Sequence, residues 1–292
     1  MSADSSSLPL AAPRWPLLTR LRRRLPRLHH PHGFYLLCLA VLCERWAALI
    51  LSSSVVLMLG ERYGYARGDA LRLAGLFNAA SYLATLPGGL AVDHALGSRR
   101  SLGVGMALLT LGYATLILST RDALWLALAL LLLGHSLFKP STQTVMVRLY
   151  EPHDRRFEAA QIACYLAINV GGTAGSLSAG LLVRGSDFRA AFLFAAAVLF
   201  AGCVLVFIGK SELQLRSKPP TITVAAGPIQ KTLSPRYRAK IIVALTLAMM
   251  MYTISFGQVE GSLLLWAQDR TDRVLLGFTI PAAWFVGLPS LL

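Results

Sequence analysis

The stretch LCLAVLCERWAALILSSSVVLML at residues 37–59 decides the fold class of this chain. It is long enough to cross the hydrocarbon core of a bilayer as a helix, and its only charged residues are Glu44 and Arg45. A second apolar stretch, LALALLLLGHSLFKPSTQTVMV at residues 126–147, contains Lys139. A charge at such depth costs on the order of 3 kcal/mol and persists mainly where it faces a partner or a water-filled path. The three charges therefore predict a buried network in a transport pathway; the alternative is that they lie near the interface and snorkel.

Composition supports a membrane protein. The chain is 55% hydrophobic and 14% charged, whereas soluble domains carry about 25% charged residues. The four cysteines lie in apolar segments without metal-ligand spacing, so we expect core residues and no metal site. Apolar runs predict helical spans near residues 34–59, 70–92, 102–119, 123–147, 159–183, 190–208 and 240–266. A last apolar run from Trp284 is too short to cross.

The net charge of +14 is concentrated in an N-terminal arm and in the stretch after the sixth span. Basic loops beside spans mark the cytoplasmic side, so we expect a multi-pass protein of the cell inner (plasma) membrane with a cytoplasmic N-terminus. The lipid bilayer is then the expected partner, and nucleic acid is not. The alternative for the arm is an organelle transit peptide, because it is rich in arginine and poor in acids.

The stretch from Lys210 to Lys240 is polar, holds several Pro and Gly residues, and shows no apolar period. We therefore predict four parts: a basic cytoplasmic arm (1–33), an N-terminal six-helix transmembrane bundle (34–209), a cytoplasmic linker (210–239) and the start of a second bundle (240–292). Six spans, a basic linker and further spans resemble the outline of the major facilitator superfamily. That resemblance implies an all-α membrane protein, here with one helix and the start of another after the first bundle, and therefore C-terminally incomplete.

The loop PGGLAVDHALGSRRSLGVG at residues 87–105 resembles the facilitator signature G-x-x-x-D-x-x-x-G-x-R. The matching residues are Gly89, Asp93, Gly97 and Arg99. Gly97 is expected to make a tight turn, and Arg99 to anchor the cytoplasmic side. The alternative is an ordinary short basic loop.

Four further segments resemble the proton-coupled oligopeptide transporter family of that superfamily. They are CERWAAL (43–49), HSLFKPSTQTVMVRLY (135–150), CYLAINVGGTAGSLSAGLL (164–182) and DRTDRVLLGFTIPAAWFVGLPSLL (269–292), which correspond to the family's E-x-x-E-R, G-x-G-x-x-K-P, F-Y-x-x-I-N-x-G and D-R-x-x-D-R…I-P-A stretches. The first acid of E-x-x-E-R is Val41 here, and Gly257 replaces an acid on the seventh span.

The resemblance implies a site. Arg45, Lys139, Asn169 and Tyr165 would bind substrate, and Glu44 would couple protons, with Glu260 as a replacement acid. Since Glu44 and Arg45 are about 100° apart around one helix, Glu44 needs a partner on another helix, and Lys139 is the candidate. For Asn78, Tyr82 and His135 we favour packing, with a proton relay as the alternative for His135.

The expected function is therefore a secondary active transporter that resembles proton-coupled di-/tripeptide symporters. Its substrates would be di-/tripeptides or another small solute together with protons, and it would need no cofactor beyond the proton gradient. We expect the chain alone to be inactive. The alternatives are a non-transporting membrane protein with a structural or regulatory role, and a facilitator for another solute. No nucleophile elbow or phosphate loop supports an enzyme.

Overall fold

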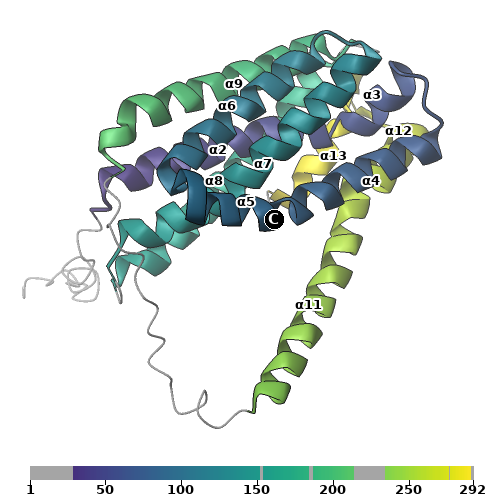
Figure 1. Cartoon of the computed structure of the whole chain (residues 1–292). Coiled ribbons are helices and arrows are strands. Elements are labelled where there is room, and N and C mark those ends of the chain that lie inside the picture. Colours follow the sequence, from purple (N-terminus) through teal and green to yellow (C-terminus); the bar gives the residue numbers. More distant parts are fainter. Residues whose placement is uncertain (1–28, 152–153, 184–186, 214–233, 276, 291–292) are drawn as a thin grey trace, which may run out of the picture. The chain divides into compact units, whose positions relative to one another are not determined.

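The computed structural model describes residues 29–151, 154–183, 187–213, 234–275 and 277–290 (Figure 1). The predicted basic arm (1–33) and linker (210–239) fall mostly outside these ranges, so the division into four parts stays a prediction. Two described edges differ from it: helix α2 begins at His32, inside the predicted arm, and helix α11 begins at Pro235, inside the predicted linker.

The described chain is almost entirely helical. Its first group of elements is α2 (His32–Ser52), α3 (Val55–Glu61), α4 (Arg67–Leu83), α5 (Thr85–Ala91), the π-helical turn η1 (Val92–Leu96), α6 (Ser98–Leu116), α7 (Arg121–Leu149), α8 (Arg156–Leu182), α9 (Arg189–Ile208) and the 3₁₀ turn η2 (Gly209–Ser211). The second group is α11 (Pro235–Gln258), the π-helical turn η3 (Val259–Leu263), α12 (Leu264–Arg270), the strands β1 (Val274–Leu275) and β2 (Phe278–Thr279), α13 (Ala283–Gly287) and the 3₁₀ turn η4 (Leu288–Ser290).

Each of the seven predicted spans corresponds to helix. In the described part, five helical segments are long and apolar enough to cross a membrane: His32–Glu61, Arg121–Leu149, Arg156–Leu182, Arg189–Ser211 and Tyr237–Arg270. Helix is the form that such segments take in lipid, because it satisfies every backbone polar group within the segment. The prediction of an all-α membrane fold is therefore confirmed.

The first predicted span is divided at Ser53 and Ser54 into α2 and α3, and the second predicted span is also not one continuous helix. It is divided at Ala84 into α4 and α5. The Thr85 hydroxyl donates to the Tyr82 carbonyl at this break. Polar residues such as Asn78 and Ser81 lie on α4 just before the break, and both line the cavity of the candidate site.

Close helix packing depends on small residues. A Cβ on Gly105 of α6 would lie 2.9 Å from the backbone nitrogen of Phe138 in α7, and a Cβ on Gly171 of α8 would lie 2.5 Å from the Leu42 carbonyl oxygen in α2. Without side chains at these positions the backbones approach each other, which is how helices associate in lipid. The core between these helices holds large buried side chains such as Phe138, Phe192 and Met106.

The facilitator-type loop forms η1 and the turn after it. Gly97 has a φ of 76° and leads directly into α6, which confirms the expected tight turn. Arg99 donates from Nε to the Leu213 carbonyl oxygen at 3.1 Å, so it ties this loop to the chain after α9. Asp93 is exposed and makes no ion pair with the described residues. Gly89 lies beside Pro140, with 3.8 Å between a Cβ built on it and the proline Cβ.

The second group of elements contacts the first at several points. Arg67 at the start of α4 pairs with Asp269 of α12, and Trp284 Nε1 of α13 donates to the Leu177 carbonyl of α8 at 3.2 Å. Helix α11 is exposed along its described side chains, for example at Met251. The contacts made by α12 and α13 therefore position these elements of the second group against α4 and α8.

Candidate functional site: a buried charge cluster

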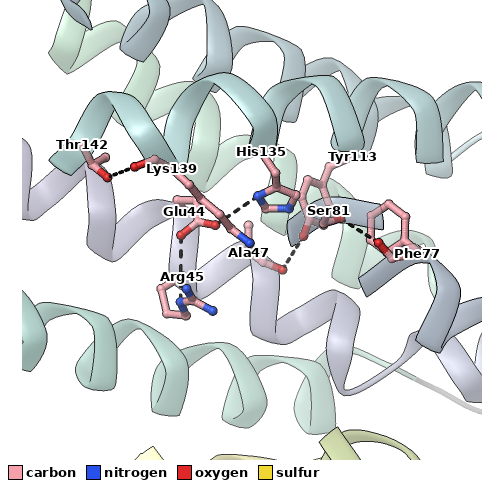
Figure 2. A network of polar contacts seen from close by, with 9 residues as sticks. All are labelled: Glu44, Arg45, Ala47, Phe77, Ser81, Tyr113, His135, Lys139 and Thr142. Atoms are coloured by element: carbon pink, nitrogen blue, oxygen red, sulfur yellow. Dashed lines mark hydrogen bonds and ion pairs between the residues drawn. The ribbon is translucent and has the colours of Figure 1, made fainter. Parts of the chain in front are cut away.

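Helices α2 and α7 bring four ionisable side chains together within the bundle (Figure 2). Glu44 and Arg45 lie on α2, whereas His135 and Lys139 lie on α7, four residues apart and therefore on one face of that helix. Glu44 is only 4% exposed, and His135 is 7% exposed. Of the three charges inferred from the sequence, Glu44 is buried, whereas Arg45 and Lys139 are half-buried.

Glu44 has two cationic or protonatable neighbours within 4.0 Å in the described part of the chain. Its Oε2 lies 3.9 Å from Nε of Arg45, and its Oε1 lies 3.3 Å from Nδ1 of His135. The predicted direct pairing of Glu44 with Lys139 is therefore wrong, and the partner on the other helix is His135. His135 is buried, as a packed residue is, and it also contacts the Glu44 carboxylate, which the preference for packing did not include.

Lys139 points elsewhere for a physical reason. Its Nζ lies 4.5 Å from the centroid of the Tyr82 ring on α4. The face of an aromatic ring attracts a cation through its quadrupole, and the attraction is strongest where water is scarce. Tyr82 thus holds the lysine toward α4 and leaves the inner end of Glu44 to the imidazole.

The cluster has unused hydrogen-bonding capacity. Oε1 of Glu44, Nε of Arg45 and Nδ1 of His135 are buried, and none of the three has a hydrogen-bond partner. Buried polar atoms are normally satisfied, because an unsatisfied one costs about 1–3 kcal/mol. Three such atoms on neighbouring side chains indicate a place where a proton, water or ligand group is taken up.

Neighbouring polar side chains hold the helices that carry the cluster. The buried Tyr113 hydroxyl of α6 donates to the Ala47 carbonyl of α2 at 2.9 Å, one turn after Glu44. Ser81 donates to the Phe77 carbonyl within α4 at 2.9 Å. Both contacts are visible in Figure 2; the first joins α6 to α2 beside the charges, and the second lies within α4.

The cluster opens into a cavity of about 120 Å³. It is lined by Glu44, Arg45, Ala48, Leu51, Ser52, Phe77, Asn78, Ser81, Tyr82, Tyr113, His135, Lys139, Thr253, Gly257 and Glu260. An adjoining cavity of about 400 Å³ shares Asn78, Tyr82 and Glu260 with it and extends between α4 and α11. Cavities of about 300–1,000 Å³ are the size in which proteins bind small molecules.

The structure brings four of the six predicted site residues together. Arg45, Lys139, Glu44 and Glu260 all line the smaller cavity. Glu260 reaches it from η3, so the two carboxylates and the two cations face a common space. Their charges balance, and a ligand carboxylate entering the space would meet the two cations.

Tyr165 and Asn169 on α8 do not line this cavity. Tyr165 is 64% exposed, and Asn169 is half-buried. Their helix turns glycines such as Gly171 toward α2, and this close contact sets which face of α8 points outward. Their role as substrate contacts stays a prediction.

Two lining residues were instead predicted to pack. Asn78 and Tyr82 of α4 contribute to both cavities. Their spacing of four residues, together with Ser81, places polar groups on one face of an otherwise apolar helix. That spacing was the signal available in the sequence. Within the described ranges, no group of three or more metal-ligating side chains is present.

Comparison with known proteins places the chain in a family. The profile of the Major Facilitator Superfamily matches residues 37–292. The peptide transporter YePEPT of Yersinia enterocolitica is 24% identical over an alignment that covers 90% of this chain and 65% of that protein. Dipeptide and tripeptide permease A of Klebsiella pneumoniae is 26% identical, with 70% of this chain and 41% of the permease covered. The chain thus spans less than two thirds of the length of these relatives.

Solved structures agree on the fold. The crystal structure of a peptide transporter POT in complex with sulfate has a TM-score of 0.74 at 20% identity, covering 91% of this chain and 67% of that one. A POT family transporter in complex with 5-aminolevulinic acid has a TM-score of 0.73 at 18% identity, covering 91% of this chain and 68% of that one. The chain therefore belongs to the Major Facilitator Superfamily, and its predicted resemblance to the oligopeptide transporters of that superfamily is confirmed.

Proposed function

We propose that this chain forms the proton- and substrate-binding part of a secondary active transporter for di- and tripeptides. The observation that carries the proposal is the cavity in which Arg45 and Lys139 face Glu44 and Glu260. Charged side chains inside a membrane bundle are costly and mark substrate or proton pathways. The relatives described as peptide transporters and peptide permeases support the choice of substrate.

The two cations provide the binding chemistry. A peptide carboxylate in the cavity contacts Arg45 and Lys139, since charge-assisted hydrogen bonds are the strongest available to it. While Glu44 is ionised it competes for Arg45, whose Nε lies 3.9 Å from it. Uptake of a proton in the cavity ends the competition of Glu44 for Arg45, so a proton and a peptide bind together. Glu260 is the second acid of the cycle, because it lines the same cavity from η3.

The setting of this activity is the cell inner membrane. The multi-pass helices span the bilayer, the basic arm lies on the cytoplasmic side, and the proton gradient replaces any cofactor. Alternating access moves one repeat against the other around a central site. Because the chain spans 65% of the length of YePEPT, we expect the isolated chain to bind peptide without concentrating it.

The test measures binding of a labelled dipeptide to the chain in nanodiscs. We expect Lys139→Ala and Arg45→Ala each to weaken binding by about 10- to 150-fold, because a hydrogen bond to a charged group contributes about 1.5–3 kcal/mol. Lys210→Ala is the matched control, since Lys210 is exposed on η2 outside the cavity. A dipeptide with an amidated C-terminus lacks the carboxylate and should bind as weakly as the variants do.

Equal affinity of the free and the amidated dipeptide, or wild-type affinity in both cation variants, would contradict the proposed site. The same chain is also reconstituted in liposomes with an inward proton gradient. Uptake against the gradient of peptide, lost in Lys139→Ala, would show that the isolated chain is a working transporter and would overturn the expectation of binding alone.

A further inference from the structure

The contact between His135 and Glu44 joins two buried groups on different helices. Nδ1 of His135 lies 3.3 Å from Oε1 of Glu44, and both atoms lack a hydrogen-bond partner. Glu44 also has a second oxygen 3.9 Å from Arg45. One carboxylate therefore lies between an arginine, which is always charged, and an imidazole, which gains its charge only by taking up a proton.

The other elements around His135 determine the charge that it meets. The ionisable residues that line the cavity together with His135 are Glu44 and Arg45 from α2, Tyr82 from α4, Tyr113 from α6, Glu260 from η3 and Lys139 on its own helix. Helix α5 carries no ionisable residue, and Asp93 and His94 of η1 are exposed. With a neutral imidazole, two carboxylates balance two cations in the cavity. A proton on His135 adds one positive charge that is not balanced.

We propose that His135 is the group of this chain that takes up the coupled proton. A proton from solution binds the ring, and the contact at 3.3 Å becomes a charge-assisted hydrogen bond from Nδ1 to Glu44. Glu44 is then held by His135, and Arg45 is released to the cavity. The peptide carboxylate binds Arg45 and Lys139 and balances the added charge. When the proton leaves His135, Glu44 returns to Arg45 and displaces the carboxylate.

This inference rests on the proposed function and assigns one step of it to a specific atom. It differs from protonation of Glu44 in the pH range that it predicts. An unperturbed carboxyl group titrates near pH 4, whereas an unperturbed imidazole titrates at about pH 6.5. Peptide affinity should therefore depend on pH near neutrality, and this dependence should require the imidazole.

The experiment measures dipeptide affinity in nanodiscs between about pH 5.5 and pH 8, the range in which imidazole changes charge. In the wild type we expect a plateau at low pH and then a loss of about tenfold for each pH unit above the midpoint, because one proton is linked to binding. His135→Asn and His135→Gln should remove this dependence. His94→Asn is the matched control, because His94 is a histidine exposed on η1, and it should keep the wild-type profile.

A second readout needs no peptide. Histidine ring signals are followed by nuclear magnetic resonance over the same pH range, and we expect one titrating signal of the wild type to be missing from both His135 variants. A cooperative thermal unfolding transition confirms that each variant is folded. Two substitutions of His135 are used so that the test remains possible if one of the two variants does not fold. A pH profile of affinity in folded His135→Asn or His135→Gln that equals the wild-type profile overturns the inference and leaves the proposed function intact. No dipeptide binding by the wild type at any pH overturns the proposed function and with it the linkage.

Discussion

At the scale of single residues, the site depends on which neighbour each charge finds. Glu44 is held by Arg45 and His135, while Lys139 lies against the Tyr82 ring. An aromatic ring attracts a cation through its quadrupole and does not form an ion pair with it. Lys139 therefore remains available to a carboxylate in the cavity, and this availability is what a substrate site requires.

The adjacent glycines of the facilitator-type loop provide a sharp test at this scale. A Cβ on Gly88 would overlap the Ser136 carbonyl oxygen of α7, whereas a Cβ on Gly89 would lie 3.8 Å from the Pro140 Cβ, an ordinary contact. We expect Gly88→Ala to lower the free energy of unfolding by about 1–3 kcal/mol, because α5 must move away from α7. Gly89→Ala should be neutral or slightly stabilising, since alanine favours a helix by about 0.5–1 kcal/mol.

Chemical or thermal unfolding in detergent measures both variants. An equal loss in the two, or a larger loss for Gly89→Ala, would show that α5 and α7 do not approach each other at Ser136. Gly89 is the glycine that matches the facilitator signature, whereas Gly88 is the one that contacts α7. The experiment therefore also shows which of the two glycines the packing of α5 on α7 requires.

At the scale of elements, two irregular turns determine which residues line the cavity. The break at Ala84 separates α4, which lines the cavity, from α5, which packs against α7. The π-helical turn η3 places Glu260 at the cavity between α11 and α12. Such turns are rare within helices and are frequent at functional sites. Together they bring an acid of the second group of elements to face the cations of the first.

The ion pair between Arg67 of α4 and Asp269 of α12 is one of the contacts that position this second group. We expect Arg67→Asp to speed amide hydrogen exchange in α12 about two- to fivefold, because exposed ion pairs contribute up to about 1 kcal/mol. The Arg67 side chain is 71% exposed, which keeps the effect small.

The reversed pair, Arg67→Asp with Asp269→Arg, should restore the wild-type exchange in α12. If amide hydrogens of α12 exchanged as fast in the double variant as in Arg67→Asp, the ion pair between Arg67 and Asp269 would be contradicted. Exchange in α8, which neither residue contacts, is the internal control.

At the scale of the whole molecule, side-chain contacts gather the loops into two sets. Arg121 donates to the Tyr63 carbonyl at 3.4 Å, which joins the loops after the first and third spans; with the expected cytoplasmic N-terminus, both would lie outside. Arg99 bonds to Leu213, and Arg148 donates to Ser98 at 3.3 Å, which joins the loops after the second, fourth and sixth spans; these would lie in the cytoplasm. The contacts agree with the alternation of charge along the chain.

Cysteine labelling tests the orientation. In a variant without the four native cysteines, we expect a membrane-impermeant reagent added outside to label Arg62→Cys and Asp122→Cys. It should not label Arg100→Cys or Lys210→Cys until the membrane is opened, because basic loops stay cytoplasmic. All four positions are exposed, so accessibility to the reagent differs only by side of the membrane. Labelling of Arg100→Cys and Lys210→Cys from outside, without labelling of Arg62→Cys and Asp122→Cys, would contradict the predicted topology.

The sequence alone determined the helices, the family and the chemistry of the site. Long apolar runs leave helix as the one local solution in lipid, and charges such as Glu44, Arg45 and Lys139 are conspicuous because their burial is costly. The partners were decided only by the tertiary structure. Which face of α7 and α4 meets Glu44 depends on how closely the helices pack at positions such as Gly88 and Gly171, and that rotation exists only when both helices are in contact. For the same reason His135 replaced Lys139 as the partner of Glu44, and Asn78 and Tyr82, rather than Tyr165 and Asn169, line the cavity.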